Sequence, residues 1–367
     1  MRGVLVQRIF PALILLTLCT TLVGCWDQRP VETRGAVAAI GVDPGSRPGV
    51  YRFTVVFPNV TTTASSLATT PSDQEFFHYT VQEPNLTAAL AAVQRRQSRS
   101  LYLGQIRILA LSTRLAPTVW GRVMRSAVQS GRMVLTFAVV GTPNAQALVS
   151  LSPHSEVVPE LALYRALTCH CQPILVANRA WRVWAEMETP GVTPDVSHVG
   201  LQDAGFVIRG IDLVTPRAIM SWSLPQTWGW AYFTGHVNEG SLTVAVAGHL
   251  ITVGRIRGRI QQSFTVVGHQ IQMHNQLTYT GQLVSGGDAL GNPLETDQRV
   301  DQAVAVRLLA LCQQALATAE ASAVDPFGWH RDLQWTHTDA GVCGDTWSCW
   351  RVTTAVHFRV RNEGILR

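Results

Sequence analysis

The sequence contains no lysine: all 29 of its basic residues are arginine. This absence excludes lysine nucleophiles, Schiff-base chemistry and a lysine that cradles a phosphate. The formal net charge is only +5 in 367 residues, and Arg2 and Arg8 at the extreme N-terminus contribute part of it. Such a small and scattered excess does not indicate nucleic-acid binding. Arg255, Arg257 and Arg259 alternate along an expected strand, which favours a solvated strand face over a phosphate or lipid-headgroup patch.

The short motifs of the common catalytic and metal sites are also missing. The sequence has no Gly-x-Ser-x-Gly elbow, no His-Glu-x-x-His, no Cys-x-x-Cys, no calcium loop and no glycine-rich phosphate loop. The 11 histidines are spread without the spacing of metal ligands. Glu186 and Glu188 stand two apart on an expected helix, so their carboxylates cannot face each other. We therefore expect no enzymatic activity, no metal and no cofactor.

The first 24 residues have the composition of a signal peptide. The basic start precedes an apolar run, Ile9–Leu22, that is shorter than the roughly 20 residues of a comfortable membrane span. The run ends in Leu-Val-Gly-Cys, which resembles the lipobox of bacterial lipoproteins, where the cysteine thiol receives a diacylglyceryl group. We expect the mature chain to begin at a lipidated Cys25 and to be held at a membrane by its acyl chains. The alternatives are an ordinary secretory signal and an uncleaved signal anchor.

Five further cysteines follow the lipidated one, an odd number that cannot pair completely within one chain. Cys343 and Cys349 flank a turn-rich loop that a disulfide can close. Cys169 and Cys171 surround a histidine, but no second cysteine pair completes a structural zinc site, and their disulfide state stays open. Cys312 stands among leucines and is expected to be a small buried hydrophobic residue.

The N-terminal half alternates strands with helices. Helices are expected after the N-cap residue Asn85, from the Thr142-Pro143 pair onward to about residue 188, and at about 117–129. Strands are predicted at residues 35–42, 50–57, 76–82, 101–111 and 133–140. This alternation is typical of an α/β domain, which we assign to residues 25–190 after the leader, residues 1–24.

Two prolines and a glycine within residues 189–194 favour a domain boundary there. Beyond it we assign a C-terminal α+β region, residues 195–367, with a further division into about 195–240 and 241–367. Its expected elements are strands at 207–219, 242–253, 256–267, 271–283 and 352–360 and a single long helix at 294–323. The whole chain is therefore predicted to be a multi-domain, mixed α/β and α+β protein with a strand-rich C-terminal region.

The long helix and the last strand carry clear burial patterns. Residues 352–360 alternate apolar and polar side chains, which predicts one buried strand face. The helix carries an apolar stripe at helical spacing. That stripe consists of Val300, Val304, Leu308, Leu311, Ala315 and Ala319.

An aromatic run precedes the second half of the C-terminal region. It consists of Trp222, Trp228, Trp230, Tyr232 and Phe233. The run is compatible with a core helix, with an exposed patch for a protein partner, or with a platform for stacking sugars, of which the last is least favoured. The three tryptophans, where they are exposed, are the candidate partner contact.

Two motifs indicate a family. Gly24-Cys25-Trp26-Asp27 precedes an apolar strand that contains Gly41 and ends at Asp43, and Asp325-Pro326-Phe327-Gly328 stands after the long helix and before the terminal strand. In this order and spacing the chain resembles the C-subunit lipoproteins of nutrient germinant receptors in endospore-forming bacteria.

The resemblance implies three α/β domains, no catalysis, and a lipid anchor on the outer surface of the spore inner membrane. It also implies a role in germination through assembly with integral-membrane A- and B-type subunits. The alternative function is a lipid-anchored extracytoplasmic solute-binding protein. Such a protein is expected to have two doubly wound lobes, and the strand-rich C-terminal half argues against it.

Overall fold

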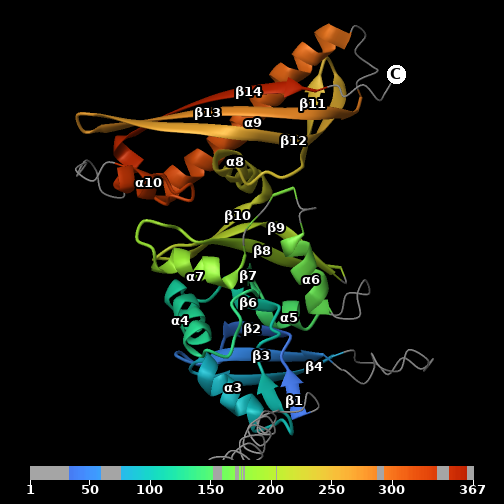
Figure 1. Cartoon of the computed structure of the whole chain (residues 1–367), viewed down its shortest axis with the longest axis vertical. Helices are drawn as coiled ribbons and strands as arrows, with labels where there is room; N and C mark the ends of the chain where they lie inside the picture. The colour runs from blue at the N-terminus through green and yellow to red at the C-terminus, as the bar shows by residue number, and fades with distance from the viewer. Residues whose placement is uncertain are drawn as a thin grey trace, which may run out of the picture.

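The structure is a computed structural model that describes residues 33–58, 76–151, 159–169, 173–174, 176, 178–203, 205–286, 293–336 and 347–361. The described chain is elongated, with its N-terminal elements at the lower end of Figure 1 and its C-terminal elements at the upper end. Its fold is mixed α/β with a strand-rich C-terminal region that contains one long helix, as the sequence predicts.

An eight-stranded mixed sheet runs through the lower and middle parts of the molecule, with its strands stacked along the long axis (Figure 1). The strand order is β10-β9-β8-β7-β6-β2-β3-β4. The central strands β2, β6, β7 and β8 are parallel, and the flanking strands are antiparallel. The strands are β2 (Ala39–Pro44), β3 (Tyr51–Pro58), β4 (Phe76–Glu83), β6 (Ile108–Ser112), β7 (Ala138–Thr142), β8 (Asp195–Gln202), β9 (Gly205–Val214) and β10 (Ile219–Ser223).

Helices bury both faces of the central strands. Successive residues of a strand point to opposite faces, so Ile40 joins one hydrophobic core and its neighbour Ala39 joins the other. The first core includes side chains of α3 (Leu86–Gln94), α4 (Pro117–Gln129) and α7 (Ala180–Glu188), and the second includes side chains of α5 (Ala145–Val149) and α6 (Pro159–Thr168). Strands buried on both faces are typical of α/β architecture.

The sheet continues across the expected boundary at residues 189–194. The strand β8, which follows this segment, pairs with β7 through only two residue pairs, Val140↔Ser197 and Gly141↔His198. The two halves of the sheet are therefore joined by a short seam. The division of the chain into domains at this point stays a prediction.

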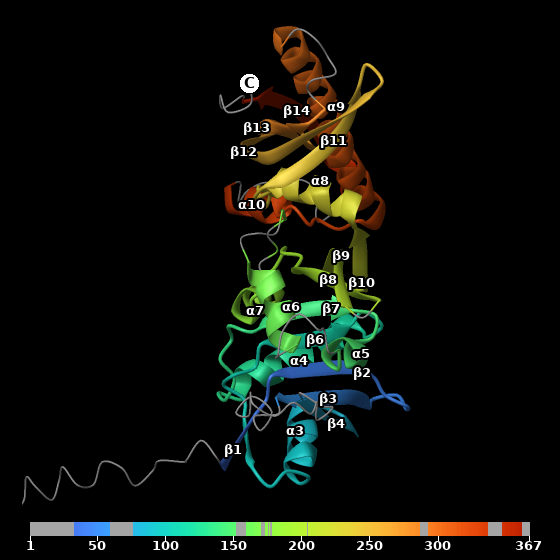
Figure 2. The ribbon, with the colours of Figure 1, turned by 90° about the vertical axis from the view of Figure 1, so that its right-hand side faces the viewer.

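The C-terminal region is built on a second, four-stranded sheet in the order β11-β12-β13-β14. Its last pair is parallel and the other pairs are antiparallel. Figure 2 shows α9 along one side of this sheet. The elements are β11 (Gly240–Val246), β12 (His249–Val267), β13 (Gln270–Ser285), β14 (Trp350–Val360), α8 (Leu224–Thr234), α9 (Pro293–Ser322) and α10 (Trp329–Thr336), with a short 3₁₀ helix at Trp347–Cys349.

The predicted patterns of α9 and β14 are confirmed. All six residues of the apolar stripe are buried in the core between α8, α9 and the sheet. In β14 the even-numbered residues from Trp350 to Val360 point inward, and the odd-numbered residues are exposed. The outer face of the four-stranded sheet is therefore open to solvent and polar.

Two predicted strands are shorter than expected because turns interrupt them. Residues 101–111 divide into β5 (Ser100–Tyr102), which pairs with β1 (Arg34–Ala36) in a separate two-stranded sheet, and β6. A turn at Gly104 and Gln105 separates the two. Likewise, a turn at residues 135–136 delays the start of β7.

Candidate functional site

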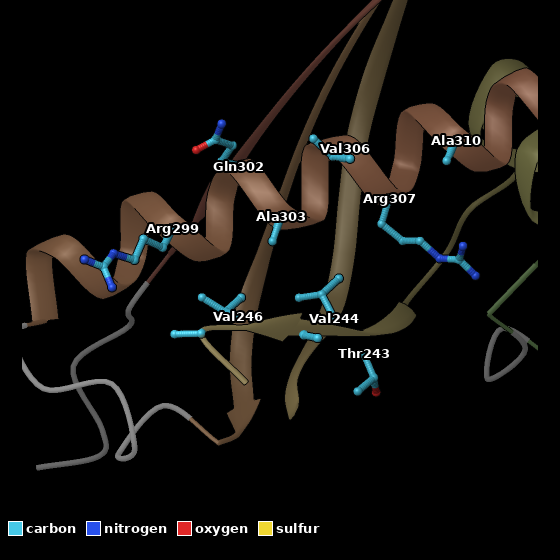
Figure 3. A pocket seen from close by; sticks show the side chains of 11 residues that line it. Thr243, Val244, Val246, Arg299, Gln302, Ala303, Val306, Arg307 and Ala310 are labelled. Atoms are coloured by element: carbon cyan, nitrogen blue, oxygen red, sulfur yellow. The ribbon is translucent and has the colours of Figure 1, made fainter. Parts of the chain in front are cut away.

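An open groove of about 860 Å³ lies between α9 and the edge strand β11. Figure 3 shows α9 side chains on one side of this α9–β11 groove and β11 side chains on the other. The lining residues are Thr243, Val244, Ala245, Val246, Ala247, Arg299, Gln302, Ala303, Val306, Arg307 and Ala310.

The helical repeat explains why these side chains face the groove. The buried stripe of α9 passes through Val300 and Val304, so Ala303 and Val306, on the adjoining face, come to lie at the side of the sheet. Val306 is 62 % exposed, which is unusual for a valine on a helix that packs against a sheet. Val244 supplies a buried apolar floor opposite it.

The charge of the α9–β11 groove has one sign. Arg299 and Arg307 line it, and none of the lining residues is acidic. In the part of the chain that the structure describes, β11 pairs with β12 alone, so its other edge is available for backbone hydrogen bonds. An extended segment with apolar and acidic side chains fits this arrangement best.

The sequence contained a signal for this groove: a second apolar face on the long helix, beside the face that is buried. Ala303, Val306 and Ala310 follow one another at spacings of three and four residues, beside the predicted stripe. A second apolar face on a helix that already has one buried face indicates a further contact. The prediction for this helix rested on the first stripe alone.

Gly41 and Asp43, from the N-terminal motif, lie on β2 and hold the start of α5. The backbone N–H groups of Ala145 and Gln146 donate to the two carboxylate oxygens of Asp43 at 2.9 and 2.7 Å. A carboxylate at this position also interacts favourably with the helix dipole. Gly41 permits the close approach, because a Cβ there would lie 2.9 Å from the carbonyl oxygen of Ala145. Both residues therefore have a structural role.

Asp325 and Gly328 form the connection from α9 to α10. The N–H groups of Phe327 and Gly328 donate to Asp325 Oδ1 at 2.9 and 3.1 Å, and the N–H of His330 donates to Oδ2 at 2.7 Å. Gly328 has φ +78°, a conformation that favours glycine. The imidazole Nδ1 of His330 lies 2.9 Å from Asp325 Oδ2. The motif thus closes a turn and caps α10.

The aromatic residues of the same motif tie α8 to α10. Phe327 stacks on Trp329 with ring centroids 4.5 Å apart, and Phe233 of α8 meets Phe327 edge-on at 5.1 Å. The indole N–H of Trp230 donates to the carbonyl of Pro326 at 2.9 Å. This motif, too, has a structural role.

Two of the three tryptophans of the expected partner contact are not exposed. Trp222 of β10 and Trp230 of α8 are only 2 % and 1 % exposed, and both lie in the core that α8 forms with α9 and the four-stranded sheet. Trp228 is half-buried and stacks on Tyr232. A partner contact at this remaining tryptophan stays a prediction. Of the alternatives open to the sequence, α8 is the core helix.

The other predicted residues belong to the N-terminal motif and to the cysteines. Gly24, Cys25, Trp26, Asp27 and Cys343 lie outside the described residues. Cys349 and Cys169 are both disulfide-bonded, and the pairing of Cys349 with Cys343 stays a prediction. Cys312 is a buried free cysteine, as predicted, and its burial raises the pKa of the thiol to about 12. None of the described helices has both the length and the apolar character needed to span a bilayer.

A serine, a histidine and an aspartate meet near the β10 edge of the large sheet. The buried carboxylate of Asp212 accepts from the Ser221 hydroxyl at 2.5 Å and lies 2.9 Å from Nδ1 of His198. The serine thus donates to the carboxylate and not to the imidazole, so the histidine does not act as its base. We assign the cluster to the packing of β8, β9 and β10. Within the described ranges, no group of three His, Cys, Asp or Glu side chains is placed to hold a metal.

A second charged cluster lies where α7 meets β8. Arg182 Nε donates to Glu186 Oε1 at 2.6 Å, and its Nη2 lies 3.6 Å from Asp195 Oδ1. Burial and the charge of Glu186 raise the pKa of the Asp195 carboxyl to about 7, although Arg182 opposes the shift. Such a cluster is able to titrate near neutral pH.

Comparisons with known proteins agree with the motifs. Residues 27–199 match the family model described as "Spore germination protein N-terminal domain". The crystal structure of the GerBC protein has the same fold, with a TM-score of 0.60 at 13 % sequence identity, over 88 % of this chain and 97 % of that chain. No curated protein matches the chain.

Residues 27–199 are thus similar to the spore germination N-terminal domain, and over most of its length the chain has the fold of the GerBC protein. The resemblance to the C subunits of nutrient germinant receptors is confirmed.

Proposed function

We propose that the protein is a non-catalytic, lipid-anchored subunit of a spore nutrient germinant receptor. It acts on the outer surface of the spore inner membrane by assembling with integral-membrane A- and B-type subunits. The observation that carries this proposal is the spore germination domain at residues 27–199, joined to a GerBC-like fold over most of the chain. The motif Gly24-Cys25-Trp26-Asp27 supports the anchor.

The anchor makes assembly possible with modest contacts. Each buried methylene of an acyl chain contributes about 0.8 kcal/mol, so two chains hold a protein at a membrane stably. Confinement to the membrane surface raises the effective concentration of the subunit near its partners. Part of the entropy cost of association is therefore removed before any protein contact forms.

We assign the α9–β11 groove as the docking site for an extended, acidic segment of one integral-membrane subunit. Arg299 and Arg307 are eight residues apart, which is about 12 Å along a helix. An extended chain covers that distance in about four residues. Because side chains alternate along a strand, acidic residues at positions i and i+4 would reach both arginines, and an apolar residue at i+2, midway between them, would meet Ala303.

A negative charge introduced into the groove tests this assignment. Val306→Asp in the full chain, co-expressed with the A- and B-type subunits, is expected to abolish co-purification, because it repels an acidic segment and removes the apolar contact. Val267→Asp is the matched control, since Val267 is also an exposed valine but lies at the other end of β12. Unchanged co-purification of Val306→Asp, with both variants folded, would show that the docking site lies elsewhere.

The solute-binding alternative has no support in the fold. Its two doubly wound lobes are not found, because the described chain forms one eight-stranded mixed sheet and one four-stranded sheet. A thermal-shift screen with amino acids and sugars separates the two functions. A ligand at 100 times its dissociation constant would stabilise the protein by about 2.7 kcal/mol, and we expect no such shift.

A further inference from the structure

The open face of the four-stranded sheet gathers arginines at one end. Strand register places Thr280 between Arg257 and Arg359, and the next row holds Arg259 and His357 on either side of Thr278. All four of these basic side chains are exposed. Asp301 of α9 offsets part of the charge of Arg359. The face is therefore basic.

A small pocket of about 290 Å³ opens at this basic end. Three arginines line it, together with one hydroxyl, one amide and one carboxylate. The lining residues are Glu239, Arg255, Arg257, Thr280, Gly281, Gln282 and Arg361. Its polar lining and small volume suit a compact anion better than an apolar ligand.

A β-bulge aims one of the arginines at the pocket. The register of β12 against β13 shifts between Gly254 and Arg257, and the inserted Arg255 has φ +51°. This backbone conformation is unfavourable for a residue other than glycine. The guanidinium Nη1 of Arg255 then donates to Gln282 Oε1 at 3.2 Å, which fixes its direction. Bulges of this kind commonly re-aim a side chain at a functional site.

The third arginine is set by the end of β14. The backbone N–H of Arg361 donates to the carbonyl of Gly281 at 2.8 Å, so its Cα is held beside the pocket floor. Among the described residues, no carboxylate pairs with Arg255 or Arg361. Within the described chain, Arg255 and Arg361 therefore line the pocket without an ion-pair partner, although Glu239 lines it too.

The one acidic residue of the pocket is held weakly. Glu239 pairs with Arg257, but their side chains are 45 % and 65 % exposed. Exposed ion pairs contribute at most about 1 kcal/mol. A dianion that binds two or three guanidinium groups can therefore displace Glu239 from Arg257.

We propose that this pocket binds a phosphate group, held by Arg255, Arg257 and Arg361 and by the hydroxyl of Thr280. Arginine binds phosphate through paired N–H donors, which gives both strength and geometry. The phosphate belongs to a lipid headgroup or to a free phosphate ion, since both present the same oxygens. Glu239 competes with it for Arg257. The proposal is independent of the assignment of the α9–β11 groove.

The test measures phosphate binding by the full, lipidated chain in a neutral detergent. Inorganic phosphate is titrated in one series, and micelles doped with phosphatidic acid are titrated in another. Arg255→Gln and Arg361→Gln are each expected to weaken binding about tenfold or more, because each removes charged hydrogen bonds. Glu239→Gln is expected to strengthen binding, because it removes the competitor. Arg351→Gln, an exposed arginine at the other end of the same face, is the control and should leave the affinity unchanged.

The pattern across the variants decides the outcome. Binding in either series that follows the expected order confirms the pocket, and the series in which it appears identifies the source of the phosphate. Binding in neither series overturns the proposal. Equal losses in Arg351→Gln and Arg255→Gln also overturn it, since they would show a diffuse charge effect. Melting midpoints of all four variants establish that they are folded.

Discussion

Asp43 and Asp325 are the two motif carboxylates in the described chain, and each accepts backbone N–H groups at the start of a helix. A helix leaves its first N–H groups unsatisfied, so a well-placed carboxylate both fills the hydrogen bonds and meets the helix dipole. Gly41 and Gly328 accompany them, one for a close approach and the other for a positive φ. The first pair thus joins α5 to β2, and the second pair joins α10 to α9.

Replacement of Gly328 tests the structural role of the second motif. Gly328→Val is expected to lower the free energy of unfolding by about 1 to 3 kcal/mol, because valine is strained at φ +78°. Chemical denaturation measures the change. Gly131→Val provides a positive-φ control outside the motif, so a loss confined to Gly328→Val would indicate that the motif makes a contribution beyond backbone strain. An unchanged midpoint for Gly328→Val would contradict the structural role.

The buried carboxyl of Asp195 predicts a pH dependence of stability. Its pKa in the folded chain is about 7, above the ordinary value of 3.8. A raised pKa means that the folded state binds the proton more tightly than the unfolded state does. The stabilisation that this proton gives to the fold is fully present below about pH 4 and is lost as the pH rises through 7. Asp195→Asn is therefore expected to be more stable than the wild type at pH 8, by about 1 kcal/mol or more, and this advantage should shrink at pH 5.

Denaturant midpoints of both proteins at the two pH values give the answer. Glu188→Gln is a suitable control, since Glu188 is an exposed partner of Arg125 at the end of α7, the helix that also carries Arg182. An advantage of Asp195→Asn that does not change with pH would contradict the titration of Asp195 in this range.

Among the elements, α8 is the one for which the sequence pattern did not decide between a buried and an exposed position. An aromatic run is compatible with a core helix or an exposed patch, because hydrophobicity does not say which neighbours cover it. The covering elements, α9 and the four-stranded sheet, come from later parts of the chain. Only the tertiary arrangement places Trp222 and Trp230 inside.

The burial of α8 predicts the effect of replacing its tryptophan side chains with alanine. Trp230→Ala is expected to destabilise the protein by about 3 to 5 kcal/mol, because it leaves a cavity. It also removes the hydrogen bond to Pro326. Trp228→Ala should cost less, since Trp228 is only half-buried. Thermal unfolding of both variants checks the order, and equal costs would contradict the packing of α8.

Among the elements, the sequence predicted the regular helices and strands well, but it did not predict the turns and register shifts between or within them. The stripe of α9 and the alternation of β14 depend on neighbours a few residues away, so the sequence specifies them directly. The turn at Gly104 and the register shift at Arg255 depend on pairing with distant strands. The α9–β11 groove combines both kinds of feature: the second apolar face of α9 is local, but the placement of β11 beside it depends on strand pairing.

On the scale of the whole molecule, the fold class and the resemblance to spore germination proteins followed from the sequence, but the sheet topology did not. The segment at 189–194 contains residues that break secondary structure, yet β8 continues the sheet through its two pairs with β7. A local break in the chain does not determine which strands pair across it. The resemblance was recognisable because the motifs include residues with strict local requirements, Gly41, Asp43, Asp325 and Gly328.

The anchor is the whole-molecule property that the motif at Cys25 predicts. Cys25→Ala is expected to leave an unprocessed chain, or one released from the membrane, and to fail to support germination, because it removes the thiol at which we expect the lipid to be attached. Intact-mass measurement of the membrane-extracted wild-type protein should show the added lipid mass. A mature wild-type form without that mass would contradict the anchor.

Purification of the native complex tests the central claim most directly. The tagged full chain is extracted from spore inner membranes in mild detergent, and the proteins that co-purify are identified and quantified by mass spectrometry. Our account predicts that both multi-pass subunits of one germinant receptor co-purify in comparable amounts, and that Cys25→Ala reduces their recovery. Recovery of the lipidated chain alone, or tight binding of a germinant by the isolated chain without those subunits, would contradict it.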